Sequence, residues 1–285
     1  MKTRLNLPQH FSFDSVVRSH GWYDLRPFSY DPARGELTTF LRGPVPLVFR
    51  ARNGGLESSA DAVESATLRS IARRVFSLDL DLSAFDGALE KDPLLRRALR
   101  RGGGRMLRAP TLFEDAVKML LTTNCSWEAT RGMVERLIAL AGDGGRSFPG
   151  PEEIARLSPG ALRQKVRCGY RAQSLSRFAR RVGSGRLDLS HWERRDISAD
   201  QVREAILSEH GFGPYAAEGL LRILGRHEYL ALDSWIRKQY RRLHPGPART
   251  ADRSIARRYA RFGEHKGLAL WLEMTAPWHE TAGST

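Results

Sequence analysis

The stretch "GFGPYAAEGLLRILGRHEYLALDSW", residues 211–235, brings together residue types that could do chemistry. Two glycines flank one apolar residue, a proline follows, and Asp233 comes later among apolar neighbours. Main-chain amides exposed at a turn before a helix can hold a phosphate anion. A carboxylate in a largely apolar cleft can stabilise a developing positive charge. The pattern therefore favours a phosphate-binding turn with a carboxylate near it.

Two helices are predicted to flank this turn. Ser198 with Gln201 three residues on is the signature of a capping box, and an apolar helical face follows up to His210. Pro214 suits the first position of a second helix, and Gly225 is a natural stop for it. The second helix begins with small residues on its inner face, so the two helices can approach closely.

Gly211 and Gly213 would allow the tight turn between the helices, with unusual backbone angles at both. The product is a helix-hairpin-helix whose exposed amides would bind phosphate without reading sequence. An ordinary helical corner without a ligand is the alternative.

Asp233 has two possible roles. It is well suited to cap the helix predicted to start at Ser234, because aspartate is among the best N-cap residues. No Glu or Gln stands at position 236 to complete a capping box, and the apolar "YLAL" before Asp233 would leave the carboxylate in a partly buried cleft. Spacing alone leaves structural and catalytic roles open.

The composition indicates a polyanionic partner. The 285 residues carry a formal net charge of +14, and only six of the 46 basic residues are lysine. Arginine suits bidentate phosphate contacts, so nucleic acid is the first expectation and a merely solvated charged surface the alternative. Two cysteines cannot form a disulfide framework or a four-cysteine cluster. With no apolar run of membrane-spanning length, we expect a soluble, cytoplasmic monomer, nucleoid-associated in a bacterium.

The first hundred residues differ from the rest. "LTTFLR" (37–42) and "VPLVFRAR" (45–52) are predicted to be antiparallel strands bounded by turn residues. Helical patterns are predicted at about 57–76 and 84–100. This region is therefore predicted to be an α+β domain built on an antiparallel sheet.

The glycine run in "RRGGGRML" marks a plausible domain boundary. Beyond it the pattern turns helical, with one helix capped by Thr111 and another that stops at Gly142. We predict an N-terminal α+β domain over 1–104, a mostly helical domain with the helix-hairpin-helix over 105–279, and a tail over 280–285.

The hairpin, its connector and "LALDSW" resemble the helix-hairpin-helix DNA glycosylase superfamily, whose hairpin is followed at this distance by an essential aspartate. "NCSWEATRGMVERL" (124–137) and "CGYRAQSL" (168–175) resemble segments of the 8-oxoguanine DNA glycosylases, and the likeness covers roughly 103–278. The resemblance implies a cleft that receives a damaged nucleotide flipped out of double-stranded DNA. It also implies that Asp233 is catalytic and stabilises an oxocarbenium-like sugar.

The departures from the family suggest the reaction type. Bifunctional members place a lysine nucleophile where this sequence has Tyr215, and no lysine occurs between Lys165 and Lys238. Schiff-base chemistry needs an amine beside the sugar carbon, so hydrolysis without strand cleavage is expected. Lysine-free members resembling 3-methyladenine DNA glycosylase II have aromatic residues there.

The predicted base pocket also departs from oxidised-guanine recognition. Positions aligned with two residues that read this base hold Leu270 and Met274, and the pocket cysteine of the hairpin helix is replaced by Gly219. These three positions, together with Tyr215 and Trp235, predict an aromatic and apolar pocket that accepts several bases. An alkylated purine is therefore the expected substrate, because a cationic base leaves readily and stacks on aromatic rings.

Further DNA contacts follow from the resemblance. Asn124 aligns with an asparagine that fills the space around the orphaned base, and Tyr170 and Arg171 align with a wedge and an arginine that contact the orphaned strand. A helix cap at Asn124 and a core-packed tyrosine are the structural alternatives. Trp127 is a weaker candidate than Trp235 for stacking on the flipped base.

Two other functions stay open. One is an 8-oxoguanine or deaminated-base glycosylase, with lyase activity through Lys238 or a distant lysine. The other is a helix-hairpin-helix protein that binds DNA without catalysis. No metal or cofactor is expected beyond a monovalent cation that the hairpin could hold.

Overall fold

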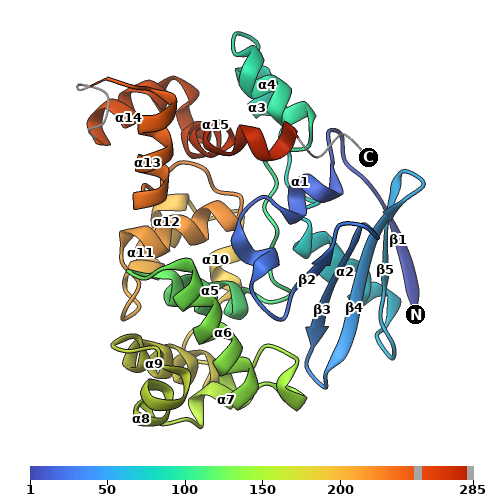
Figure 1. Ribbon diagram of the computed structural model, residues 1–285, viewed down its shortest axis with the longest axis vertical. Helices are drawn as coiled ribbons and strands as arrows, with labels where there is room; N and C mark the ends of the chain where they lie inside the picture. The colour runs from blue at the N-terminus through green and yellow to red at the C-terminus, as the bar shows by residue number, and fades with distance from the viewer. Residues whose placement is uncertain (247–251, 281–285) are drawn as a thin grey trace.

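The computed structural model describes residues 1–246 and 252–280. A sheet and one covering helix form the N-terminal part, and helices form the rest (Figure 1). All strand pairs of the sheet are antiparallel, in the order β1-β5-β4-β3-β2. Its strands are β1 (Lys2–Asn6), β2 (Ser29–Asp31), β3 (Glu36–Leu41), β4 (Val45–Arg52) and β5 (Gly55–Ser59). The predicted α+β fold class is confirmed.

The two predicted strands correspond to β3 and β4. The helix predicted from about residue 57 starts later, because Asn53 and Gly54 turn the chain with φ values of 50° and 73° into β5. The two positive φ angles suit a tight hairpin, and Leu56 of β5 is fully buried. The helix α2 then begins at Ser65.

Helices make up most of the remaining chain. The principal ones are α1 (Phe13–Val17), α2 (Ser65–Val75), α3 (Ser83–Ala88), α4 (Pro93–Arg100), α5 (Leu112–Thr122), α6 (Trp127–Ala141), α7 (Pro151–Ala155), α8 (Pro159–Ala161), α9 (Arg171–Gly183), α10 (Ser190–Glu193), α11 (Ala199–Leu207), α12 (Pro214–Ile223), α13 (Ser234–Leu243), α14 (Asp252–Tyr259) and α15 (Lys266–Glu280). The predicted cap at Thr111 is observed, since its Oγ1 accepts a hydrogen bond of 3.2 Å from Glu114 N. No helix of the described residues is long and apolar enough to cross a membrane.

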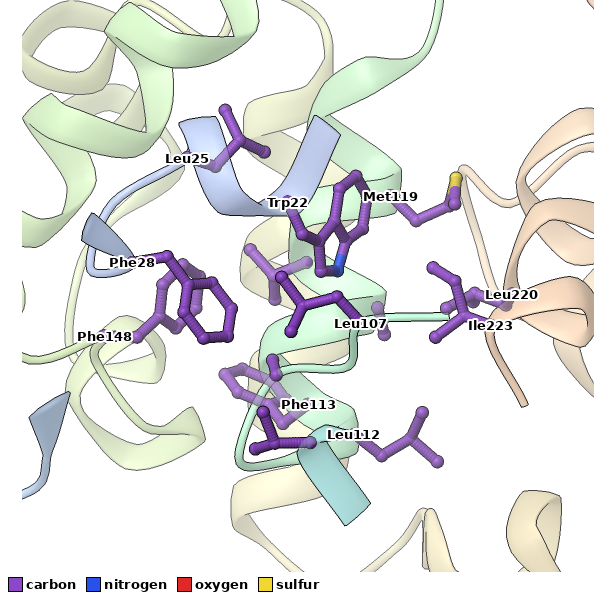
Figure 2. Packing of buried hydrophobic residues seen from close by; sticks show 14 of the residues in the cluster. Trp22, Leu25, Phe28, Leu107, Leu112, Phe113, Met119, Phe148, Leu220 and Ile223 are labelled. Carbon is purple, nitrogen blue, oxygen red and sulfur yellow. The ribbon is translucent and has the colours of Figure 1, made fainter. Parts of the chain in front are cut away.

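One hydrophobic core joins the sheet to the helices. Figure 2 shows Trp22 and Phe28, from the segment between β1 and β2, packed beside Leu107 and Phe113. Met119 of α5 lies on the side of this cluster that faces α12. The packing therefore links the N-terminal part directly to the helix that follows the hairpin.

A second core cluster contains residues from both sides of the predicted boundary at residue 104. Phe85 of α3 and Leu99 of α4 are buried with Tyr240 of α13 and Leu268 of α15. In Figure 1, α3 and α4 lie beside α15, away from the sheet. Residues 83–100 thus follow the sheet in sequence but pack with the last helices, because their apolar faces complete that cluster. Residue 280 ends α15, and the rest of the predicted tail, 281–285, lies outside the described residues.

Candidate active site

The predicted helix-hairpin-helix is present. It consists of α11 and α12, and the capping box that starts α11 is complete. Gln201 N donates to Ser198 Oγ at 3.2 Å, and Ser198 N donates to Gln201 Oε1 at 2.9 Å. Pro214 is the first residue of α12, and Gly225 follows its end with a φ of 75°.

Glycine is needed at positions 211 and 213 for different structural reasons. Gly211 has a φ of 93°, and a Cβ there would lie 2.3 Å from Ser174 Oγ. Gly213 has an ordinary φ of −90° and caps α12, so unusual backbone angles are confirmed at Gly211 and wrong at Gly213. A Cβ at Gly213 would meet no described atom within 4 Å. Gly213 therefore leaves open space in front of the first turn of α12.

A large cavity of about 1390 Å³ lies beside the hairpin. Residues 20–22, the end of α5, the start of α12, the segment 231–235 and α15 supply its walls. These segments are far apart in sequence and include both sides of the predicted boundary at residue 104. The cavity is a product of the tertiary fold.

Asp233 lines this cavity and is also the N-cap of α13. Its Oδ1 accepts a hydrogen bond of 2.6 Å from Ile236 N. No other group of the described residues hydrogen-bonds the carboxylate, so Oδ2 keeps its acceptor capacity. Asp233 can therefore cap α13 through Oδ1 and still offer Oδ2 to a ligand in the cavity.

Tyr215 lies in the cavity wall with its hydroxyl 3.3 Å from Thr122 Oγ1, to which it donates. Burial raises the pKa of this phenol. One turn further along α12, a Cβ on Gly219 would lie 2.8 Å from Met119 Cε. Gly219 lines the cavity as expected, but it adds no free space there, because Met119 occupies the volume that the missing side chain leaves.

Arg222 is a cavity residue that the sequence analysis missed. Its guanidinium carbon lies 4.4 Å from the centroid of the Trp271 ring, and its Nη2 donates to Leu230 O at 2.7 Å. Its Nε is buried without a partner among the described residues, and burial lowers the pKa of the guanidinium to about 10. Tyr215, Gly219 and Arg222 have the sequence spacing of residues on one helix face. This spacing could have indicated that Arg222 lines the same cavity as Tyr215.

Three tryptophans gather at the cavity. The ring centroid of Trp235 lies 5.6 Å from that of Trp271 and 5.4 Å from that of Trp278. Leu270 and Met274, which were expected in the base pocket, are instead 0% and 3% exposed in the second core cluster. Trp271 and Trp278, seven residues apart on one face of α15, line the cavity instead.

The rim of the cavity contains two of the predicted DNA contacts. Asn124, with a φ of 46°, donates from Nδ2 to the Tyr170 hydroxyl at 3.3 Å, and the Tyr170 side chain is 61% exposed. Arg171 is only 6% exposed, so a direct contact of its side chain with DNA is not supported. Its Nε donates to Thr123 Oγ1 at 3.2 Å and its guanidinium lies 4.6 Å from the Tyr170 ring centroid. Arg171 therefore positions the rim.

Another part of the cavity wall is formed by residues 20–22 of the N-terminal part and by Trp127 of α6. Trp127 is 38% exposed, donates from Nε1 to Asp24 Oδ2 at 2.7 Å, and packs on Gly21, where a Cβ would lie 2.3 Å from its ring. His20 donates from Nε2 to Leu107 O at 2.7 Å. Burial lowers the pKa of His20 to about 4, so this cavity residue is neutral near pH 7.

These observations define a class of protein: a helix-hairpin-helix beside a deep aromatic cavity whose wall holds an aspartate at a helix N-terminus. A family profile described as "HhH-GPD superfamily base excision DNA repair protein" matches residues 117–265. The chain belongs to this superfamily.

Individual relatives are more distant. A probable N-glycosylase/DNA lyase of Methanothermobacter thermautotrophicus is 26% identical over 65% of this chain and 66% of its own length. A DNA-3-methyladenine glycosylase of Bacillus subtilis is 27% identical over 51% of this chain and 50% of its own. The chain thus spans between half and two thirds of these relatives.

Solved structures share the whole architecture. An 8-oxoguanine glycosylase/lyase of Clostridium acetobutylicum has a TM-score of 0.74 at 17% identity, covering 96% of this chain and 95% of that one. At this identity the likeness concerns the fold.

Proposed function

We propose that this protein is a monofunctional DNA glycosylase that hydrolyses the N-glycosidic bond of a damaged base flipped out of double-stranded DNA. The observation that carries the proposal is Asp233, whose Oδ2 is available in a cavity next to the hairpin. The family of base excision DNA repair proteins and the names of the relatives support this function.

The surface around the cavity suits a DNA backbone. The first turn of α12 follows Gly213, whose surroundings are open, so a phosphate can approach the helix N-terminus. Tyr170 and Asn124 stand exposed at the rim, where a wedge would separate the bases next to an extruded nucleotide.

The reaction follows from the groups in the cavity. The flipped base stacks among the tryptophans, and the bond between sugar C1′ and the base nitrogen breaks with its electron pair going to the base. Asp233 stabilises the oxocarbenium-like sugar, and water adds to C1′ while its proton passes to the carboxylate. The products are a free base and an abasic site.

Strand cleavage is not part of the proposed reaction. Tyr215 stands in the hairpin helix where lyases of the superfamily have lysine, and no lysine of the described residues lines the cavity. Borohydride trapping on DNA that carries an excised lesion should give no covalent adduct. An adduct, as the lyase name of one relative suggests for that protein, would overturn the monofunctional assignment.

An alkylated purine is the proposed substrate. The cavity offers Trp235, Trp271 and Trp278 to an electron-poor ring, and attraction between a cationic base and aromatic faces favours this lesion. Single-lesion duplexes with 3-methyladenine, 7-methylguanine, hypoxanthine, ethenoadenine, uracil and 8-oxoguanine, scored for abasic sites after alkali, test the assignment. Release of 8-oxoguanine faster than every alkylated base would contradict it.

The Asp233→Asn variant tests the catalytic role. Asn caps helices as well as Asp does, so α13 and the fold should persist. We expect base release to fall by about 100-fold or more while duplex affinity stays nearly unchanged. Undiminished release would contradict the role of Asp233, whereas a wild-type protein that releases no base from any duplex would support a purely DNA-binding function.

The hairpin could also hold a monovalent cation. The carbonyls of His210, Gly211 and Phe212 accept no hydrogen bond from any described residue, and carbonyl oxygens suit such a cation. We propose no other cofactor, and we propose that the protein acts as a monomer. Within the described residues no group of three His, Cys, Asp or Glu could bind a metal.

A further inference from the structure

A second, smaller cavity of about 350 Å³ lies on the outer face of α9, separate from the Asp233 cavity. We call it the α9 pocket. The side chains that the argument uses are Ser176, Arg177, Arg180, Arg181 and Arg186. Four of these five residues are arginine, and the reaction proposed above uses none of them.

The α9 pocket carries unbalanced positive charge. Arg181 forms an ion pair with Glu209, with 3.0 Å between Nε and Oε2. Arg177, Arg180 and Arg186 form no ion pair with any carboxylate of the described residues. These three guanidinium groups are exposed around one small pocket, and an anion between them would relieve their mutual repulsion.

Ser176 gives a second, independent indication of a ligand. It lines the pocket but is only 2% exposed, and its hydroxyl has no hydrogen-bond partner among the described residues. Buried hydroxyls in folded proteins normally have a partner. An oxygen atom of a bound anion would supply the acceptor that Ser176 lacks.

The α9 pocket adjoins the hairpin. Ser174 of the same helix touches Gly211, and its Oγ lies 2.9 Å from His210 Nδ1. Arg181 of the pocket also pairs with Glu209, two residues before Gly211. The pocket and the hairpin are therefore connected through the side chains of α9.

We propose that the α9 pocket binds a phosphate group, with Arg177 and Arg180 holding its oxygens and Ser176 donating its hydroxyl. A backbone phosphate of the duplex that the hairpin holds is the nearest source, and this part of the proposal rests on the proposed function. Free phosphate presents the same chemistry. Either ligand adds a second anion site beyond the hairpin.

The test uses the double variant Arg177→Gln/Arg180→Gln. Arg52→Gln/Arg69→Gln is the matched control, because both arginines are exposed in the sheet domain and the same two charges are removed. Affinity for a long undamaged duplex is measured between about 50 and 200 mM salt. Inorganic phosphate and pyrophosphate are titrated separately, with the melting temperature as the readout.

If the pocket holds a backbone phosphate, the slope of log affinity against log salt should become shallower by about 0.9 per lost contact, and by less in the control. If it holds free phosphate, the anions should raise the melting temperature of wild type and control but not of the double variant. A double variant that matches its control in both measurements would overturn the proposal.

Ser176→Ala separates ligand binding from folding. Loss of an unpartnered hydroxyl should not lower the melting temperature, so weaker phosphate or duplex binding in this variant would show that the hydroxyl contacts the ligand. Unchanged binding would contradict the assigned role of Ser176. Failure of the proposed function would look different: no base would be released, while the arginine variants still changed the salt slope.

Discussion

Arg222 places a positive charge in the wall of the cavity that also holds Asp233. The charge is buried against Trp271, and carbonyl oxygens hold it in place. Its charge weakens the attraction that the tryptophans and Asp233 exert on a cationic base, and it stabilises a neutral base that departs with an extra electron pair. Arg222 should therefore influence which lesions leave fastest.

Arg222→Gln should shift the preference toward cationic lesions. We expect the ratio of 7-methylguanine to hypoxanthine release to rise by about tenfold, which corresponds to ~1.4 kcal/mol. Single-turnover rates on the two duplexes measure this ratio. Arg226→Gln is the control, because Arg226 is also buried and donates to Ile197 O at 2.8 Å but does not line the cavity. Equal ratios in both variants would contradict a charge effect.

At the level of the element, one glycine of the hairpin serves the fold and the other serves ligand binding. Gly211 needs its positive φ and its contact with Ser174, whereas Gly213 has ordinary angles and open space around it. Gly211 is therefore required for the fold, whereas Gly213 leaves room for a phosphate group to approach the N-terminus of α12.

Gly213→Val should leave the melting temperature nearly unchanged but weaken binding to damaged and undamaged duplexes alike, by about tenfold. Gly211→Ala should instead destabilise the fold by about 2 kcal/mol, because of the strained φ and the Ser174 contact. Calorimetry and duplex titration distinguish the two. Loss of binding to only one lesion in Gly213→Val would contradict a phosphate contact.

In the whole molecule, Asp115 joins segments from three parts of the chain. Its Oδ1 accepts hydrogen bonds from Trp22 Nε1 at 2.9 Å and Ala109 N at 2.8 Å, and its Oδ2 lies 3.0 Å from Arg74 Nη2. The carboxylate is fully buried. The sheet domain, the linker and α5 therefore share one charged centre.

Asp115→Asn should lower the free energy of unfolding by about 2 kcal/mol, because an amide group replaces one of the two carboxylate oxygens that accept the buried hydrogen bonds. Arg74 keeps its ion pair with Glu193 in this variant. Arg73→Gln removes the exposed ion pair with Asp79 and should cost at most about 1 kcal/mol. Denaturant unfolding followed by fluorescence and by circular dichroism measures both. An equal loss in the two variants would contradict the role of Asp115.

The local features of the site could be predicted from the amino-acid sequence. The caps at Thr111, Ser198 and Asp233 were predictable, because a capping side chain bonds an amide only three residues away. The hairpin and β3 and β4 were predictable for the same reason, since glycine, proline and alternating apolar residues act over a few positions.

Which residues face the cavity could not be predicted from the sequence, because it depends on long-range packing. Trp271 rather than Leu270 lines it, because the rotation of α15 depends on packing against helices far away in sequence. Met119 of α5 occupies the space beside Gly219. Residues 83–100 pack against the last helices instead of the sheet. Such contacts depend on complementary shapes across the fold, and no short-range pattern encodes them.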